Sequence, residues 1–305
     1  IESTAGWLAS KGIKKGDVVA LHLPNSLNFI VAAYGLWRIG AVPSPLSLLS
    51  TPESVTAQIK DSGAKMLLTV AALGDASSQG AKDAGIDEDF IVHLDTSKGM
   101  QQIMAERRTA PAVEIDPDED LAILPYSSGT TGLPKGVRLM HRQLVANVQQ
   151  GQDLNLIQRD DIVYAVLPFF HIYGLTALVN LALAQRSTLV VVPRFELQSF
   201  LEHHQKFNVT FTLIAPPIAV QLAKHPMVDN YDLSRMRAVF SGAATLDEDL
   251  AVALENRLGI HVQQGFGMTE TSPLAHANVS KDINRGSIGK PCANTCLLYT
   301  SPSPR

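Results

Sequence analysis

The sequence predicts an α/β fold built on two doubly wound, mostly parallel sheets that are flanked by helices. Two observations support this prediction: short apolar segments of strand length alternate with helical patterns, and the alternation runs twice along the 305 residues. Strands that are joined by helices lie parallel in one sheet, and both faces of that sheet are covered. A chain with 46% hydrophobic and only 18% charged residues fits such buried strands.

The first round of alternation covers residues 1–120. Pro52–Ser62 is predicted to be a helix because Thr51 is a favourable N-cap and proline suits the first turn. The segment Leu73–Glu119 has a weaker pattern, and we expect it to be peripheral, with one clear strand at Ile91–Leu94. The other expected elements are helices at Ile1–Ser10 and Phe29–Ile39 and strands at Val18–Leu23, Ala41–Pro43 and Met66–Val70.

Residues 121–295 contain the second round. The apolar run Leu175–Ala184 is well short of the roughly 18 to 20 residues that a membrane-spanning helix needs, so we expect no transmembrane segment. The expected helices are Arg142–Gln150, Leu175–Ala184 and Leu197–His204. The expected strands are Leu121–Leu124, Val137–Met140, Ile162–Val166, Ser187–Val192, Thr210–Ile214 and Ala238–Ser241.

Charge and cysteine content exclude several classes of protein. The net charge is -4, from 25 basic and 29 acidic residues, and no basic stripe with interleaved aromatic residues is present, so nucleic acid is not an expected partner. Cys292 and Cys296 are the only two cysteines. They argue against a disulfide framework and for a reducing compartment, and they lack the accompanying histidine or cysteine pair of a zinc site.

A loop rich in glycine and hydroxyl groups follows the predicted strand Leu121–Leu124. Residues 126–136 read Tyr-Ser-Ser-Gly-Thr-Thr-Gly-Leu-Pro-Lys-Gly. Glycines let the backbone fold closely around an anion, hydroxyl and N–H groups donate to phosphate oxygens, and the lysine adds a positive charge. The loop therefore predicts a polyphosphate site. It is not a Walker A loop, because Lys135 is followed by Gly136 and an apolar strand rather than by Ser or Thr and a helix.

The order of residues in this loop resembles the signature of the adenylate-forming family. That family includes acyl-CoA ligases, 4-coumarate–CoA ligases, firefly-type luciferases and the adenylation domains of peptide synthetases. Three further segments resemble motifs of the family in the same order: Leu-Pro-Phe-Phe-His-Ile-Tyr-Gly at 167–174, Ser-Gly-Ala-Ala at 241–244 and Gln-Gly-Phe-Gly-Met-Thr-Glu-Thr at 264–271. The resemblance covers Ile1 to about Thr295 and is strongest to 4-coumarate–CoA ligases and luciferase-like acyl-CoA ligases.

The resemblance implies a reaction that uses ATP, Mg²⁺ and, as a co-substrate, CoA. The family first joins a carboxylate to the α-phosphate of ATP and then lets a thiol displace AMP. Lys135 would hold the β- and γ-phosphates, Thr269 the α-phosphate and Glu270 the metal, while His171 would border the carboxylate and the path of the thiol. The residues implied for binding ATP or AMP are Ser127, Ser128, Gly129, Thr130, Thr131, Gly132, Lys135, Ala243, Gln264, Gly265, Phe266 and Thr269.

The remaining implied roles concern the pocket of the acid and the site of CoA. A lone histidine among apolar neighbours is usually a core residue, and a lone glutamate is usually a solvated carboxylate, so His171 and Glu270 are singled out by their motifs. Arg194 would face the phosphates of CoA. The residues implied for the pocket of the acid are His171, Tyr173, Ala177, Phe240, Ala243, Gly267 and Ala277.

A complete family member continues beyond these motifs with an aspartate that holds the ribose, a hinge and a small C-terminal domain that carries a catalytic lysine. We therefore expect residues 1–295 to be a partial N-terminal domain that is truncated at both ends, with the C-terminal domain absent. Cys296–Arg305 contains two Ser-Pro pairs within four residues, which suit neither a strand nor a helix, and we expect it to be a non-native tail. Such a chain on its own is expected to be nearly or wholly inactive.

Three other functions stay open at this point. The chain could derive from an enzyme that activates an amino acid for a carrier protein, from a luciferase-type oxidase, or from a non-catalytic nucleotide-binding protein. The first usually has an acidic residue in the histidine motif, and Phe170–Tyr173 offers none, while intact Lys135 and Glu270 count against a decayed site. The expected small-molecule partners are a carboxylic acid, ATP and CoA, and the expected location is the cytoplasm or the peroxisome.

Overall fold

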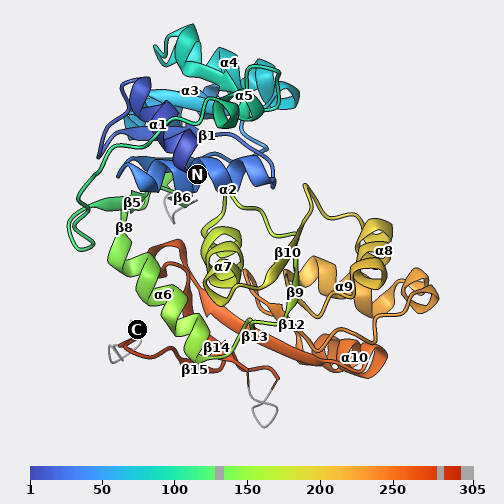
Figure 1. Ribbon diagram of the computed structural model, residues 1–305. Coiled ribbons are helices and arrows are strands. Elements are labelled where there is room, and N and C mark those ends of the chain that lie inside the picture. The colour runs from blue at the N-terminus through green and yellow to red at the C-terminus, as the bar shows by residue number, and fades with distance from the viewer. Residues whose placement is uncertain (128–133, 280–284, 297–305) are drawn as a thin grey trace.

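A computed structural model describes residues 1–127, 134–279 and 285–296, and it confirms the predicted α/β fold with two mainly parallel sheets and flanking helices. Figure 1 shows the elements of the first sheet, coloured blue to teal, above those of the second sheet, coloured yellow to orange. Helix α2 (Leu27–Arg38) lies at the boundary between the two groups. Within the described residues, no helix combines the length and the apolar character needed to cross a membrane.

The first sheet contains four parallel strands in the order β2–β1–β3–β4. Its strands are buried on both faces, which explains their almost wholly apolar composition. Val19 and Leu21 pack on the side of α1 and α2, whereas Ala20 packs on the side of α3 and α4. Besides α2, the elements of this unit are, in chain order, α1 (Glu2–Ser10), β1 (Val18–Leu21), β2 (Val42–Pro45), α3 (Pro52–Ser62), β3 (Met66–Thr69), η1 (Ala71–Leu73), α4 (Gly74–Asp83), η2 (Glu88–Phe90), β4 (Ile91–His93) and α5 (Met100–Ala105).

Local sequence explains where α3 begins and ends. The Thr51 hydroxyl accepts a hydrogen bond from the N–H of Ser54, and Gly63 ends the helix in the left-handed conformation, at φ 64°. By contrast, helix α4 was not predicted. Its buried face consists of small residues such as Ser77 and Ala81, so it lacks the apolar stripe that marks a helix in a sequence. Because α4 packs on α3 and β3, the segment Leu73–Glu119 is less peripheral than predicted.

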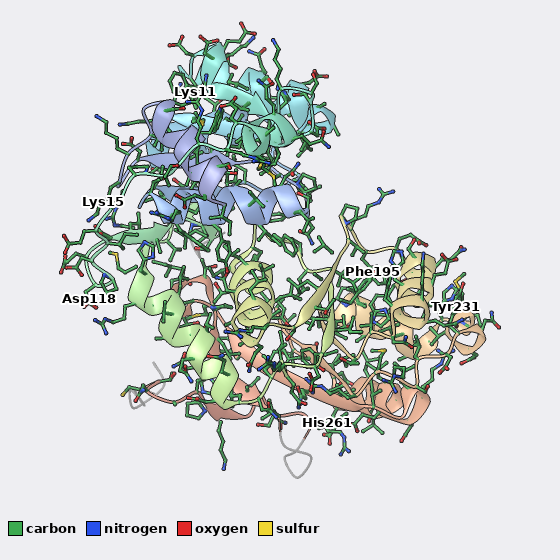
Figure 2. The ribbon with its side chains drawn as sticks, viewed as in Figure 1. Lys11, Lys15, Asp118, Phe195, Tyr231 and His261 are labelled. Carbon is green, nitrogen blue, oxygen red and sulfur yellow. The ribbon has the colours of Figure 1, made fainter. Side chains whose placement is uncertain are left out.

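The second sheet contains seven strands in the order β10–β9–β11–β12–β13–β14–β15. The first five of these pair in parallel, and β14 and β15 are antiparallel to their neighbours. Figure 2 shows His261, the first residue of β13, at the edge of the second unit that lies farthest from the first sheet. The elements are α6 (His141–Asp153), β9 (Ile162–Ala165), the π-helix η3 (Tyr173–Asn180), α7 (Leu181–Gln185), β10 (Thr188–Val191), α8 (Leu197–Phe207), β11 (Phe211–Ile214), α9 (Pro216–Lys224), η4 (Pro226–Asn230), β12 (Ala238–Ser241), α10 (Glu248–Leu258), β13 (His261–Gly267), η5 (Thr269–Thr271), β14 (Leu274–Asn278) and β15 (Lys290–Pro291).

Helices cover both faces of this second sheet. Val163 and Ala165 of β9 pack on the side of α6, η3 and α7, whereas Tyr164 packs on the side of α8, α9 and α10. The chain runs from β9 to β10 in one direction and then from β11 to β13 in the other. The carboxyl ends of β9 and β11 therefore form a topological switch point, where open α/β sheets place their ligand sites.

Several strands and helices differ from the predicted ones. The helix expected at Leu175–Ala184 is largely the π-helix η3, whose eight residues are all buried. Strands β13 and β14 were not predicted, because β13 contains two glycines and three polar residues. Of the strand expected at Val137–Met140, only Leu139–Met140 (β8) is a strand, and a second short strand, β7 (Lys135–Gly136), precedes it.

Two small antiparallel sheets connect the larger ones. Strand β5 (Leu121–Ile123) pairs with β8, and β6 (Tyr126–Ser127) pairs with β7. The N–H of Leu124 donates to the carbonyl of Pro43 at 3.0 Å, so this part of the chain is attached to the edge of the first sheet. Figure 2 shows Lys15 and Asp118 at the same edge, where the chain leaves the first unit for α6. Lys15 forms an ion pair with Asp120 there at 2.6 Å.

Asn25 joins the first unit to the second. It lies just after β1 and is 5% exposed, and its Nδ2 donates to the carbonyl of Leu167 at 2.8 Å while its Oδ1 accepts from the N–H of Phe169 at 2.7 Å. The ring of Phe29 packs edge-on against Phe169 beside this pair of bonds, with 5.8 Å between the ring centroids. A single asparagine thus fixes the segment that follows β9 against the first sheet.

Replacing Asn25 with alanine is expected to destabilise the fold. The change leaves a buried carbonyl and a buried N–H without their partner, so we expect a loss of about 2–4 kcal/mol in the free energy of unfolding. Urea unfolding measures this loss. Asn230→Ala, at an exposed position, is the matched control and should change the free energy by less than about 0.5 kcal/mol. Equal stability of the two variants would contradict the role of Asn25.

A buried ion pair closes the other end of the second sheet. Asp161, 4% exposed, accepts from Nε of Arg237 at 2.8 Å and from the Thr210 hydroxyl at 2.7 Å. The guanidinium of Arg237 also lies over the ring of Phe211, 4.5 Å from its centroid. Burial alone would raise the pKa of Asp161, but the bonds from Arg237, from the backbone and from Thr210 outweigh it and hold the pKa below its usual value.

This ion pair should make stability depend on pH. Because the pKa of Asp161 is lower in the folded chain than in the unfolded one, its contribution is complete above about pH 4 and is lost as the pH falls through the folded value. Arg237→Ala should lower the free energy of unfolding by about 2–4 kcal/mol at pH 7, since it leaves a buried carboxylate unpaired. On acidification, the stability of this variant should fall by less than that of the parent chain. Urea unfolding at pH 7 and at about pH 2 tests this, and an equal loss of stability on acidification in the two chains would refute it.

Candidate functional site

Three segments of the predicted motifs follow the carboxyl ends of parallel strands in the second sheet. Residues 166–172 follow β9, residues 242–244 follow β12, and residues 268–271 follow β13. Because parallel strands place their carboxyl ends at one edge of the sheet, these three segments are brought to the same edge. The sequence predicted the motifs and the strands β9 and β12, but not the strand β13.

A direct contact joins the base of the phosphate loop to the last of these motifs. The Ser127 hydroxyl donates to Oε1 of Glu270 at 3.2 Å, although the two residues are 143 positions apart. In the β6–β7 pair, Lys135 lies opposite Ser127. Carboxylate and hydroxyl oxygens are ligands that Mg²⁺ prefers, so Ser127 and Glu270 fit a magnesium–nucleotide complex. The central residues of the predicted loop, Ser128, Gly129, Thr130, Thr131 and Gly132, lie outside the described residues.

A cavity of about 670 Å³ opens beside this contact. Its walls come from both sheets: α3 and the segment after β2 on one side, and the histidine motif and η5 on the other. Ser127, His171 and Thr269, three of the predicted site residues, line it together. The remaining lining residues described by the structure are Pro45, Ser47, Leu49, Ser50, Glu53, Ser54, Ala57, Gln58, Asp61, Pro125, Tyr126, Pro134, Phe170 and Ile172.

His171 lies on the wall of this cavity in a restrained conformation. Its ring Nδ1 accepts a hydrogen bond from the backbone N–H of Tyr173 at 3.2 Å. The backbone N–H of His171 donates to the carbonyl of Pro168 at 3.1 Å. Partial desolvation by the surrounding residues lowers the pKa of His171 below its ordinary value. The ring is therefore neutral at pH 7, and with Nδ1 as the acceptor its proton is on Nε2.

The π-helix η3 begins directly after His171, and two glycines allow its close packing. A Cβ on Gly174 would lie 2.1 Å from the carbonyl oxygen of Pro168, and a Cβ on Gly242 would lie 2.8 Å from the Tyr173 ring. The Tyr173 hydroxyl donates to the backbone carbonyls of Ile214 and Phe240. Burial raises the pKa of Tyr173, so the phenol stays protonated and ties the motif after β9 to β11 and β12.

The residues predicted for the pocket of the acid are distributed between the core and the surface. Four of them belong to one buried cluster that spans both sheets, and they are not among the described residues that line the 670 Å³ cavity: Tyr173, Ala177, Phe240 and Ala277. Gly267 is exposed at the end of β13, and Arg194 is exposed in the segment after β10. Their roles in binding the acid or CoA stay predictions.

The turn after β12 and the end of β13 carry several of the residues predicted to bind ATP or AMP. Ala243 is exposed and has a φ of 73°, a conformation that costs a residue with a side chain on the order of 1 kcal/mol and is concentrated at functional sites. The Phe266 ring is 43% exposed, with a bulge between Phe266 and Gly267 that turns the strand. By contrast, Gln264 is buried, and its side-chain amide donates to the carbonyl of Arg285.

Three residues near the site were given no role by the sequence analysis: Asn25, Asp61 and Tyr126. Asn25 fixes the backbone of the histidine motif from the first unit. Asp61 of α3 accepts a hydrogen bond from the Tyr126 hydroxyl at 2.5 Å, just before the phosphate loop. Their partners are 142 and 65 positions away in the chain. The only sequence signal was a polar residue next to an apolar strand for Asn25 and an aromatic residue that opens the loop for Tyr126.

Comparison with known proteins identifies the family of the chain. The profile of the family described as "AMP-binding enzyme" matches residues 1–298. The 4-coumarate–CoA ligase of Vanilla planifolia is 38% identical over 97% of this chain and 56% of its own length, and 4-coumarate–CoA ligase 1 of Solanum tuberosum is 38% identical over 95% and 55%. The chain thus spans about half the length of these relatives.

Solved structures show the same fold. A long-chain-fatty-acid–CoA ligase from Archaeoglobus fulgidus has a TM-score of 0.88 at 26% identity, over 95% of this chain and 60% of that one. ATP-bound MatB from Rhodopseudomonas palustris has a TM-score of 0.83 at 26% identity, over 95% and 57%. An inhibitor-bound N-terminal domain of FACL13 from Mycobacterium tuberculosis has a TM-score of 0.85 at 26% identity, over 95% and 73%. The chain belongs to the AMP-binding enzyme family.

Proposed function

We propose that this chain forms part of an enzyme that activates a carboxylic acid with ATP and transfers the acyl group to CoA. The observation that carries the proposal is the convergence of Ser127, His171, Thr269 and Glu270 beside one cavity, from segments that are far apart in the chain. The acyl-CoA ligases among the relatives and solved structures support it. ATP binding is supported by the ATP-bound MatB structure, which shares the fold.

In the first step, a carboxylate oxygen of the acid attacks the α-phosphorus of ATP. A new oxygen–phosphorus bond forms, the bond to the bridging oxygen breaks, and pyrophosphate leaves with the electron pair. A carboxylate is already ionised at neutral pH, so the step needs no general base. It requires that two anions be aligned and their charges balanced, which positioned cations and donors achieve. Lys135 and the phosphate loop would hold the departing phosphates, and Thr269 the α-phosphate.

Glu270 and Ser127 are the residues that would hold magnesium. Glu270 and Ser127 present oxygen atoms at the edge of the cavity, 3.2 Å apart. When bound with the nucleotide, Mg²⁺ would neutralise negative charge on the phosphates. The hydrogen bond between Ser127 and Glu270 orients both oxygens toward the same place before the nucleotide arrives.

In the second step, the thiol of CoA displaces AMP from the acyl-adenylate. The sulfur forms a bond to the acyl carbon, the carbon–oxygen bond to AMP breaks, and the thiol proton is released. His171 lies on the cavity wall as a neutral ring with its proton on Nε2, next to the apolar side chains of Phe170 and Ile172. We assign His171 to the boundary between the acid and the incoming thiol.

The complete protein, expressed from its full reading frame, is expected to release pyrophosphate only when a suitable acid is present. A screen of aryl and aliphatic acids, with and without CoA, measures pyrophosphate and acyl-CoA together. Acid-dependent pyrophosphate with CoA-dependent thioester is the expected result. Light emission or acylation of a carrier protein instead of thioester would contradict CoA as the acceptor. Absence of pyrophosphate with every acid would contradict adenylation.

Glu270→Gln is expected to weaken binding of Mg-ATP by about tenfold, because the neutral amide is a poorer ligand for the metal. Calorimetric titration of the complete protein with Mg-ATP measures the loss. Glu248→Gln, an exposed change at the start of α10, is the matched control and should bind as the parent does. A Glu270→Gln variant with parental affinity for Mg-ATP would contradict the assignment of Glu270 to the metal.

A further inference from the structure

The phosphate loop emerges from a very small piece of regular structure. Strands β6 and β7 have two residues each, and they form a two-stranded sheet in which β7 is exposed. Isolated two-stranded sheets are marginally stable in water, even when they are much longer. The direction in which Ser127 leaves this sheet therefore depends on contacts outside the sheet.

The Tyr126 side chain makes one contact within this sheet and one outside it. Its ring lies against Gly136 of β7, where an added Cβ would come within 3.2 Å of Cζ. Its hydroxyl donates to Oδ2 of Asp61 at 2.5 Å. Asp61 lies in the last turn of α3, which belongs to the first sheet, so this bond attaches β6 to the first unit. Hydrogen bonds to an ionised acceptor are shorter and stronger than neutral ones.

The Tyr126 hydroxyl is the donor of this bond, because an ionised carboxylate can only accept. The Asp61–Tyr126 bond also stands between two cavities, since both residues line the 670 Å³ cavity and a second one of about 440 Å³.

Tyr126 and Ser127 hold the strand from opposite sides. Successive residues of a β-strand point to opposite faces. Tyr126 reaches α3 of the first unit, and Ser127 reaches Glu270, which follows β13 of the second unit. A rotation of β6 about its own axis would change both contacts at once, so the bond to Asp61 limits where the Ser127 hydroxyl can lie.

We propose that Asp61 is a positioning residue for the phosphate loop, acting through Tyr126 to hold β6 where Ser127 meets Glu270. The inference rests on the proposed function of the loop as a polyphosphate site. Asp61 itself does not touch the nucleotide in this scheme. Its loss should therefore affect ligands that carry the β- and γ-phosphates and leave ligands that lack them unaffected.

The experiment compares Asp61→Ala, Tyr126→Phe and the double variant with the control Asp89→Ala, an exposed change in η2. Affinities for Mg-ATP and for AMP are measured by calorimetry on the complete protein. Each single variant should bind Mg-ATP about fivefold more weakly, as the loss of one hydrogen bond predicts, with AMP affinity within about twofold of the parent. The double variant should be no weaker than the single ones, because both changes remove the same bond.

A second measurement does not depend on nucleotide. Amide hydrogen exchange at residues 135–137 should be faster in both single variants than in the parent and the control, because β7 loses its attachment through β6. Equal loss of Mg-ATP and AMP affinity, additive losses in the double variant, or unchanged exchange would each overturn the proposal. If the parent binds neither nucleotide, the proposed function fails, and the exchange rates still decide whether Asp61 positions β6.

Discussion

The parallel direction of β9, β11, β12 and β13 is the constraint on which the rest of the site depends. Parallel strands end at one edge of the sheet, so the direction of the strands brings together the segments that follow β9, β12 and β13. The change of direction between β9 and β11 opens a space at that edge. The first sheet covers the space, and its helix α3 forms the opposite wall of the cavity.

Contacts of the histidine motif with the first unit and with β11 and β12 convert this shared edge into a defined geometry. Asn25 binds the backbone on both sides of Pro168, and Tyr173 binds the carbonyls of Ile214 and Phe240. These bonds are made by buried polar groups, which are costly to leave unpaired, so the alternative arrangements are strongly disfavoured. The position of His171 between them is therefore set by the packing of both units.

Elements with a strong apolar pattern could be predicted from the sequence, and elements defined by small or polar residues could not. Helix α3 was predicted with its bounds, and Thr51 and Pro52 mark its start. Helix α4 was missed because its buried face consists of small side chains. The π-helix was predicted as an ordinary helix, since a segment that is apolar on all sides has no period that distinguishes the two.

Only those parts of the candidate site that lie within one continuous segment of the sequence could be predicted. The phosphate loop, His171, Thr269 and Glu270 each stand in a segment whose order of residues is informative. The contact between Ser127 and Glu270, and the bonds of Asn25 and Asp61, join residues 65 to 144 positions apart. No local pattern contains both partners of such a bond. Their pairing follows from the order of the strands, which the sequence pattern left open.

The long separation between Ser127 and Glu270 has a consequence for the order in which the protein folds. A ribosome adds residues from the N-terminus, so the strands of the first sheet and Tyr126 emerge well before β13, and Asp61 can hold β6 before Glu270 exists. Until the segment after β9 arrives, Phe29 lacks its partner Phe169. A ligand that bridges Ser127 and Glu270 binds only the form in which the two sheets are docked. By mass action, such a ligand would shift the equilibrium towards the docked form.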